Sequence, residues 1–131
     1  MYTRQQKVMN ELGLQGERLV EEKYLHEGWQ LLARNYKPGF GRQTGELDLI
    51  FLKAKLIVFV EVKTRSNSKF GSPFEAVDFF KQRKLIKTAK MYLRSHPKFA
   101  DYNYRIDVAA VDVDNQTQPV IILTNAIEDL D

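Results

Sequence analysis

The fold is decided by two strand-like runs of sequence, Glu46-Leu-Asp-Leu-Ile-Phe-Leu52 and Leu56-Ile-Val-Phe-Val-Glu-Val-Lys63. Only the three residues Lys53-Ala-Lys55 separate them, and so short a connection requires an antiparallel hairpin. The second run is almost entirely apolar as far as Glu61, as expected of a strand that is covered on both faces. We therefore expect this strand to lie in the centre of a sheet.

Composition sets the size and class of the molecule. The 131 residues are 44% hydrophobic and 28% charged, which suits one globular domain with a single core over residues 1–131. No stretch approaches the roughly 18 uninterrupted apolar residues of a membrane span, and the N-terminal segment lacks the apolar core of a signal peptide. We therefore expect a cytoplasmic protein that has no membrane partner.

Residue usage also limits the metal chemistry. The sequence contains no cysteine, so disulfides, zinc fingers, iron–sulfur clusters and thiol nucleophiles are excluded. A bound metal must then be held by oxygen atoms or by the two histidines. Oxygen ligands favour a hard cation, and we expect Mg²⁺ or Mn²⁺.

Apolar periodicity and helix-breaking residues place the other elements around the hairpin. Two helices are expected, one from about Gln5 to Glu27 and one from about Phe74 to Ser95. Further strands are expected at Trp29 to Tyr36, Tyr104 to Asp112 and Val120 to Thr124, with loops over residues 37–45 and 66–73 and a short helix closing the chain.

The first predicted helix contains two glycines near its apolar side. Val8, Leu12 and Leu19 share that side, and Gly13 and Gly16 fall on or beside it. Glycine destabilises a helix, so two of them in this position indicate that the backbone packs closely against a sheet or a neighbouring strand.

The hairpin carries a group of charged residues at its far end. Alternate residues of a strand share a face. Glu46 and Asp48 therefore point the same way on one strand, and Glu61 and Lys63 point the same way on the other. If the hairpin is centred between residues 54 and 55, Asp48 lies opposite Glu61, with about 5 Å between their Cβ atoms. That distance suits a shared cation. A slip of one residue would separate the carboxylates, and the sequence does not fix the register.

A plainer interpretation of this group is an ordinary surface ion pair. Glu-x-Lys pairs are common, and the first predicted helix contains another at Glu21-Glu-Lys23. The surroundings favour a functional role, because Glu61 and Lys63 end an apolar run whose partner strand presents Asp48 between two leucines. Two such carboxylates raise each other's pKa unless a cation or a lysine balances their charge.

The second predicted helix has a basic face. There is no acidic residue between positions 79 and 94, and four cations recur at intervals of four, three and four: Arg83, Lys87, Lys90 and Arg94. The apolar residues are expected largely on the opposite side: Phe79, Leu85, Ile86, Ala89 and Leu93. A solvated amphipathic helix usually mixes both signs of charge, so a stripe of one sign favours contact with nucleic-acid phosphates over contact with an acidic protein.

Two blocks of the hairpin carry a family resemblance. Gly45-Glu-Leu-Asp-Leu-Ile50 followed by Val58-Phe-Val-Glu-Val-Lys-Thr-Arg65 resembles the signature of the bacterial YraN-like family, a branch of the PD-(D/E)xK superfamily of restriction-endonuclease-like and Holliday-junction-resolvase-like proteins. Weaker matches extend over most of the chain: Gly13-x-x-Gly16-Glu17, Asn35-Tyr36, Ala76-Val77, Lys81 or Lys84, Tyr92-Leu93 and Arg105-Ile-Asp-Val108.

The resemblance implies a fold and a set of site residues. The fold is an α/β restriction-endonuclease-like one, with a central mixed β-sheet flanked by helices. Asp48 and Glu61 would be metal ligands, the carbonyl of Val62 a further ligand, and Lys63 the catalytic lysine. Glu17 matches the acidic residue that related enzymes supply from their first helix, although it sits on an otherwise charged helix where a solvated side chain is the plain alternative.

Three functions remain open at this stage. The first is an Mg²⁺- or Mn²⁺-dependent endonuclease acting on DNA rather than RNA, with branched DNA as one candidate substrate. The second is a module that binds nucleic acid through the basic helix without cutting it, and the third is a protein that acts through protein contacts alone. A two-fold homodimer, in which two sites would cut opposing strands, is an idea that comes from the resemblance only.

Overall fold

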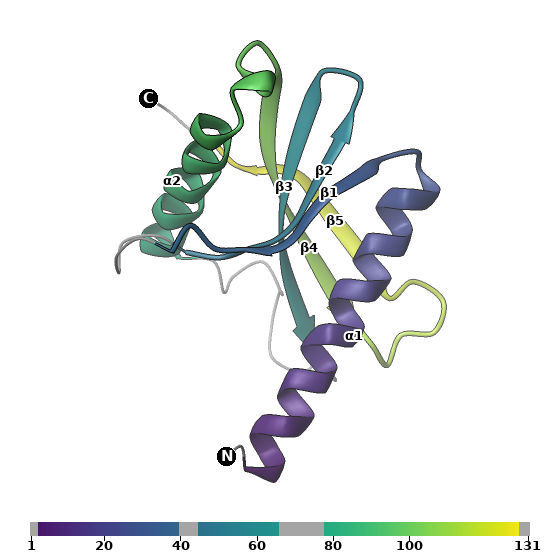
Figure 1. The fold of residues 1–131 in the computed structure, drawn as a ribbon. Helices are drawn as coiled ribbons and strands as arrows, with labels where there is room; N and C mark the ends of the chain where they lie inside the picture. The colour runs from purple at the N-terminus through teal and green to yellow at the C-terminus, as the bar shows by residue number, and fades with distance from the viewer. Residues whose placement is uncertain (1–2, 40–44, 66–77, 129–131) are drawn as a thin grey trace.

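The computed structural model describes residues 3–39, 45–65 and 78–128. A five-stranded sheet with strand order β1-β2-β3-β4-β5 forms its centre. The strands are β1 (Gln30–Tyr36), β2 (Leu47–Lys53), β3 (Leu56–Arg65), β4 (Asn103–Asp112) and β5 (Val120–Ile127), and the helices are α1 (Arg4–His26), α2 (Phe79–Ser95) and the 3-10 turn η2 (Pro97–Phe99). The helices flank the sheet (Figure 1), and this α/β arrangement is consistent with the restriction-endonuclease-like fold.

Strand directions make the sheet mixed. β3 pairs with β4 in parallel, and the other neighbouring pairs are antiparallel. The register of the central hairpin runs from Lys53 opposite Leu56 to Leu49 opposite Val60. Continued by one residue, this register places Asp48 opposite Glu61. The hairpin is therefore centred between residues 54 and 55, as the first of the two sequence alternatives required.

The two helices cover opposite faces of the sheet, and each seals a separate apolar core. On one face Val20 and Tyr24 of α1 pack with Phe51 and Val60 of the sheet. On the other, Leu85, Ala89 and Tyr92 of α2 pack with residues that include Leu47, Ile50, Phe59 and Ile106. β3 contributes side chains to both cores, which explains why its sequence is a nearly continuous apolar run.

Several element boundaries differ from the sequence prediction. β2 begins at Leu47, and Glu46 lies before it. α2 begins at Phe79 because Asp78 caps it by accepting a hydrogen bond from the Lys81 N–H, whereas residues 74–77 of the predicted helix lie outside the described residues. β5 continues to Ile127 where a short helix was expected, and residues 129–131 lie outside the described part.

The inward face of α1 is also rotated relative to the prediction. Val8 is 56% exposed, and the residues that α1 buries most completely are Val20 and Tyr24. The prediction of close backbone packing is confirmed at Gly16, where an added Cβ would overlap the side chain of Thr64 on β3. It is wrong at Gly13, where an added Cβ would meet nothing within 4 Å.

Tyr24 connects α1 to a buried polar group of the sheet. Its hydroxyl donates a hydrogen bond of 2.7 Å to Asp107, a fully buried residue of β4. Asp107 also accepts from the Arg105 side chain and from the Asn125 backbone N–H. These donors satisfy a carboxylate that would otherwise be costly to bury.

Within residues 3–39, 45–65 and 78–128, no helix is both long enough and apolar enough to cross a bilayer.

Candidate functional site

The candidate site begins where β2 and β3 stop pairing through their backbones. The paired register ends at Leu49 and Val60. Beyond this pair, the Asp48 carboxylate accepts a hydrogen bond of 2.7 Å from the Val62 N–H, so a side chain continues the contact between the strands. The Asp48 side chain therefore takes a place that a backbone carbonyl would take in a continuous ladder. This fixes one carboxylate in the gap between the two strands.

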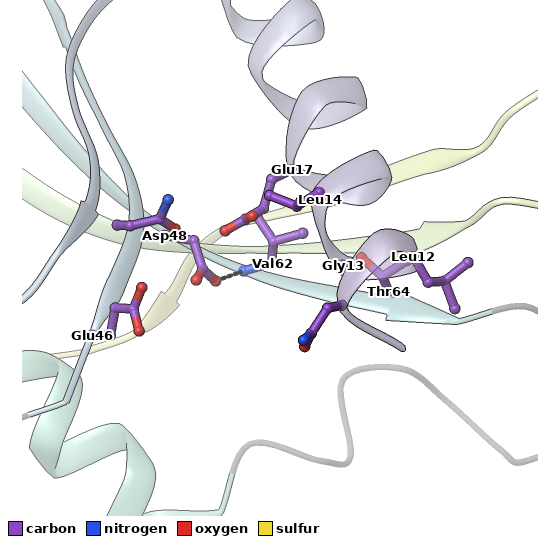
Figure 2. A pocket seen from close by; sticks show the side chains of 10 residues that line it. Leu12, Gly13, Leu14, Glu17, Glu46, Asp48, Val62 and Thr64 are labelled. Atoms are coloured by element: carbon purple, nitrogen blue, oxygen red, sulfur yellow. Dashed lines mark hydrogen bonds between the residues drawn. The ribbon is translucent and has the colours of Figure 1, made fainter. Parts of the chain in front are cut away.

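A hollow of about 600 Å³, called here the carboxylate hollow, opens beside Asp48. Its wall includes Glu17 of α1, Glu46 before β2, Asp48 of β2, and Val62 and Thr64 of β3. Figure 2 shows these side chains around the hollow, on α1, beside the start of β2 and near the end of β3. The surface therefore brings three carboxylates to one concave place.

The position of Glu17 follows from the glycine that precedes it. Gly16 has no side chain, so α1 approaches the end of β3 closely enough to contact Thr64. That approach brings the next residue, Glu17, to the edge of the carboxylate hollow. Its carboxyl group forms a hydrogen bond with that of Asp48.

Asp48 is the most strongly perturbed acid of the site. Burial, followed by the negative charge of Glu61, raises the pKa of its carboxyl group to about 8, against the lowering effect of the Val62 N–H. Burial also raises the pKa of Glu17, together with the charges of Glu46 and Glu61. At neutral pH Asp48 is therefore mostly protonated, which allows it to donate the hydrogen bond to Glu17.

Glu61 lies on the α2 side of β3, where it is only 6% exposed. Burial raises the pKa of its carboxyl group, and the charges of Lys81 and Lys63 oppose that rise. The Lys81 ammonium approaches Glu61 Oε1 to 3.3 Å. The charge of Glu61 is thus balanced mainly by a lysine from α2, with Lys63 as a second cation.

Lys63 follows Glu61 on the same face of β3 and lies beside Lys81. Burial lowers the pKa of the Lys63 amine, and the neighbouring positive charge of Lys81 lowers it further. The carboxylates of Glu61 and Asp48 act in the opposite direction. A lysine whose pKa is lowered releases its proton more readily than a free lysine.

The oxygen atoms available at this place suit a hard divalent cation. Glu61 is buried and Asp48 is half-buried. Burial and then the charge of Glu61 raise the pKa of Asp48, and a bound cation would relieve this repulsion. The Val62 carbonyl belongs to the residue that follows Glu61, and Glu17 adds a carboxyl group from α1. In the described part of the chain, however, no three Asp, Glu or His side chains already lie close enough together to form a complete metal-binding group.

Lys81 was not among the site residues predicted from the motif, although a signal for it exists in the sequence. The residues that α2 buries are Leu85, Thr88, Ala89 and Tyr92. Lys81 lies four residues before Leu85, so it continues the inward stripe by one turn. A lysine on the buried side of a helix usually has a partner, which here is Glu61.

The basic face of α2 forms largely as predicted. Arg83, Lys87 and Arg94 are exposed and Lys90 is half-buried. The prediction of the apolar side is confirmed for Leu85, Ile86, Ala89 and Leu93, which pack in or against the core. It is wrong for Phe79. Phe79 is 63% exposed, and the Arg83 guanidinium lies 5.5 Å from its ring centre, because residues four apart share a side of a helix.

Sequence comparison identifies relatives that span most of the chain. The profile of the Uncharacterised protein family UPF0102 matches residues 16–111. The chain belongs to the UPF0102 family. A UPF0102 protein of Vibrio parahaemolyticus is 43% identical over 101 residues, which are 77% of this chain and 80% of that protein. A UPF0102 protein of Stutzerimonas stutzeri is 36% identical over 116 residues, 88% of this chain and 93% of that protein.

This UPF0102 membership confirms the predicted family, which the hairpin motifs indicated under the name YraN-like. The matched segment contains four residues of the candidate site, Glu17, Asp48, Glu61 and Lys63. The family description names no reaction. The chemistry of this UPF0102 protein must therefore be inferred from its side chains.

Proposed function

We propose that this UPF0102 protein is a metal-dependent nuclease that binds DNA and hydrolyses its phosphodiester bonds, with Mg²⁺ or Mn²⁺ as the cofactor and branched DNA as one candidate substrate. The observation that carries the proposal is the neighbouring pair Asp48 and Glu61. Burial, followed by the charge of Glu61 on the adjacent strand, raises the pKa of Asp48 to about 8. A protein maintains such a repulsive arrangement at a cost in stability, which indicates a functional use.

Each residue of the site has a role in this proposal. Asp48, Glu61 and the Val62 carbonyl would hold the cation, and Glu17 would complete its ligands. The cation supplies a Lewis acid that stabilises negative charge on a phosphate oxygen. Lys63 orients the attacking water and accepts a proton from it, consistent with the lowered pKa of its amine. Lys81 keeps Glu61 ionised by an ion pair of 3.3 Å.

The basic face of α2 would position the substrate. Arg83, Lys87, Lys90 and Arg94 form the face, and α2 also supplies Lys81 to the site, so one helix connects the two. Contacts to phosphates carry no sequence information by themselves. Binding should therefore depend strongly on salt and weakly on sequence.

A second function is favoured by one observation. The Lys81 ammonium lies 3.3 Å from Glu61 and offsets its charge. A protein that only binds nucleic acid could keep its acidic site in this form, as a structural remnant on a nuclease scaffold. The two functions differ in whether a divalent cation binds at Asp48 and Glu61.

Titration calorimetry with Mn²⁺ and with Mg²⁺ separates them. We would compare the wild type with Asp48→Asn and Glu61→Gln, which keep the size of each side chain and remove its charge. Glu22→Gln, on the exposed side of α1, is the matched control. The same samples are then incubated with linear and branched DNA.

For a nuclease, the heat of metal binding is present in the wild type and in Glu22→Gln and is lost in both site variants, and the wild type cleaves DNA. If the wild type gives no heat even with DNA present, the catalytic proposal is wrong and the binding module remains. Salt-insensitive binding, or no binding, to any DNA would contradict both functions.

The Lys81 ion pair gives a separate prediction about stability. Lys81→Gln removes the cation beside a buried carboxylate, and we expect the free energy of unfolding to fall by about 1 kcal/mol at neutral pH, a value reduced because Lys81 is partly exposed. Lys84→Gln is the control, because Lys84 is exposed on the same helix. Equal denaturant midpoints for the two variants would show that the pair does not hold α2 against β3.

A further inference from the structure

Two aromatic side chains at the start of α2 are unusually open to solvent. Phe79 is 63% exposed and Phe80 is 77% exposed, the two highest values among the large hydrophobic residues described. Their ring centres lie 6.0 Å apart in an edge-to-face arrangement. Two adjacent open phenylalanines expose apolar surface that folding alone would not favour.

Phe80 borders a second concavity. This helix-start hollow has a volume of about 310 Å³, and its wall includes Phe80, Lys81, Lys84 and Glu46. Glu46 also borders the carboxylate hollow, so the two concavities meet at this side chain. Lys81 lines the helix-start hollow and contacts Glu61, which places the aromatic pair next to the candidate site.

The charges around the pair indicate what kind of molecule covers it. Arg83 lies 5.5 Å from the Phe79 ring centre, and Lys84 is on the wall of the helix-start hollow. No acidic residue occurs in α2, and Asp78 before it is engaged in capping the helix. Open aromatic rings flanked by cations match the two parts of a single nucleic-acid strand, which offers flat bases and anionic phosphates.

Glu46 and Asp78 limit how such a strand can lie, since both are on the wall of the helix-start hollow. A phosphate would be repelled by these carboxylates. The edge of a nucleobase would not, because its amino groups donate hydrogen bonds to carboxylates. The base therefore belongs in the helix-start hollow against Phe80, and the phosphates belong outside it, near Arg83.

From this geometry we infer that Phe79 and Phe80 form a stacking platform for unpaired bases, so that the preferred substrate class is nucleic acid with a single-stranded segment next to the scissile site. The inference rests on the proposed function and deepens it. The basic face of α2 contacts phosphates in both duplex and single strand. The aromatic platform engages only bases that are not already stacked in a duplex.

Fluorescence anisotropy tests the platform in a chelating buffer, where cleavage does not interfere. The probes are a short labelled oligothymidine strand and a blunt duplex of the same length. The variants are the double changes Phe79→Ala/Phe80→Ala and Phe79→Trp/Phe80→Trp. Ile121→Ala/Leu123→Ala is the matched control, since these β5 side chains are 49% and 45% exposed. Circular dichroism checks that each variant is folded.

The alanine variant should bind the single strand about tenfold more weakly or worse, because stacking contributes roughly 1–3 kcal/mol per base. Its affinity for the duplex should change little, and the tryptophan and β5 variants should bind the single strand like the wild type. Unchanged single-strand affinity, or an equal loss for both probes, overturns the platform and leaves the proposed function intact. If the wild type binds neither probe, both the platform and the proposed function are overturned. If only the alanine variant changes its oligomeric state, the two rings belong to a protein interface instead.

Discussion

Replacing Asp48 with asparagine should stabilise the protein when no divalent cation is present. The carboxyl group is held in the gap between β2 and β3, where burial and the charge of Glu61 raise its pKa to about 8. Asparagine has nearly the same shape, and its side-chain oxygen can still accept the hydrogen bond from the Val62 N–H. The variant therefore loses the ionisation and keeps the local packing.

The size of this stabilisation follows from the difference between the pKa values of Asp48 in the folded and unfolded chain. The ordinary value is 3.8 and the folded value is about 8, so the folded chain holds a proton that the unfolded chain releases over this range. The contribution of Asp48 to the free energy of unfolding should therefore be most favourable below pH 4. As the pH rises from 4 to about 8, this contribution should fall by at most ~1.4 kcal/mol per pH unit. The carboxylate hollow lets water reach the charge, so we expect a gain of ~1–3 kcal/mol for Asp48→Asn at pH 7.

Chemical denaturation in the presence of a chelator, at pH 5 and at pH 8, measures this effect. The difference between Asp48→Asn and the wild type should be small at pH 5 and should grow towards pH 8. Asp101→Asn is the control, because Asp101 is 72% exposed and its ion pair with Lys55, at 3.5 Å, should contribute little. A variant that is less stable than the wild type at pH 8 would refute the reasoning, since it would mean that the carboxylate stabilises the fold.

Three further substitutions test how α1 is held. Gly16→Ala should lower the free energy of unfolding by about 1–3 kcal/mol, because the added methyl group overlaps Thr64. Gly13→Ala should raise it by about 0.5–1 kcal/mol, because the added methyl group meets open space and alanine favours the helix. Urea denaturation compares the two, and equal effects would contradict the close contact. Tyr24→Phe should cost about 1–2 kcal/mol in thermal unfolding, because it removes one donor from the buried Asp107, and an unchanged midpoint would show that the remaining donors suffice.

The hairpin could be predicted from the sequence because it depends on neighbouring residues. A connection of three residues allows few ways to pair two strands, but the choice between the two registers left open by the sequence came from the structure. The pairing of Leu49 with Val60 then determines where Asp48 and Glu61 meet. The family could be predicted for the same reason, since its signature lies within this hairpin.

Other features depend on tertiary packing that local patterns do not encode. The composition of α1 does not show which of its two glycines meets β3, because that depends on where the helix crosses the sheet. The ion pair between Lys81 and Glu61 joins residues twenty positions apart across a long connection. Phe79 was misplaced because hydrophobicity alone assigned it to the core, although its spacing from Arg83 puts it on the outer side of α2.

The parallel pairing of β3 with β4 has a consequence for the order in which the site assembles during folding. The β2–β3 hairpin closes over a short turn, whereas β4 and α2 can dock only after a much longer loop has closed. The acids at positions 48 and 61 should therefore become neighbours early, and the compensating lysine of α2 should arrive late. Mild acid should then accelerate refolding, and loss of that lysine should appear mainly as faster unfolding.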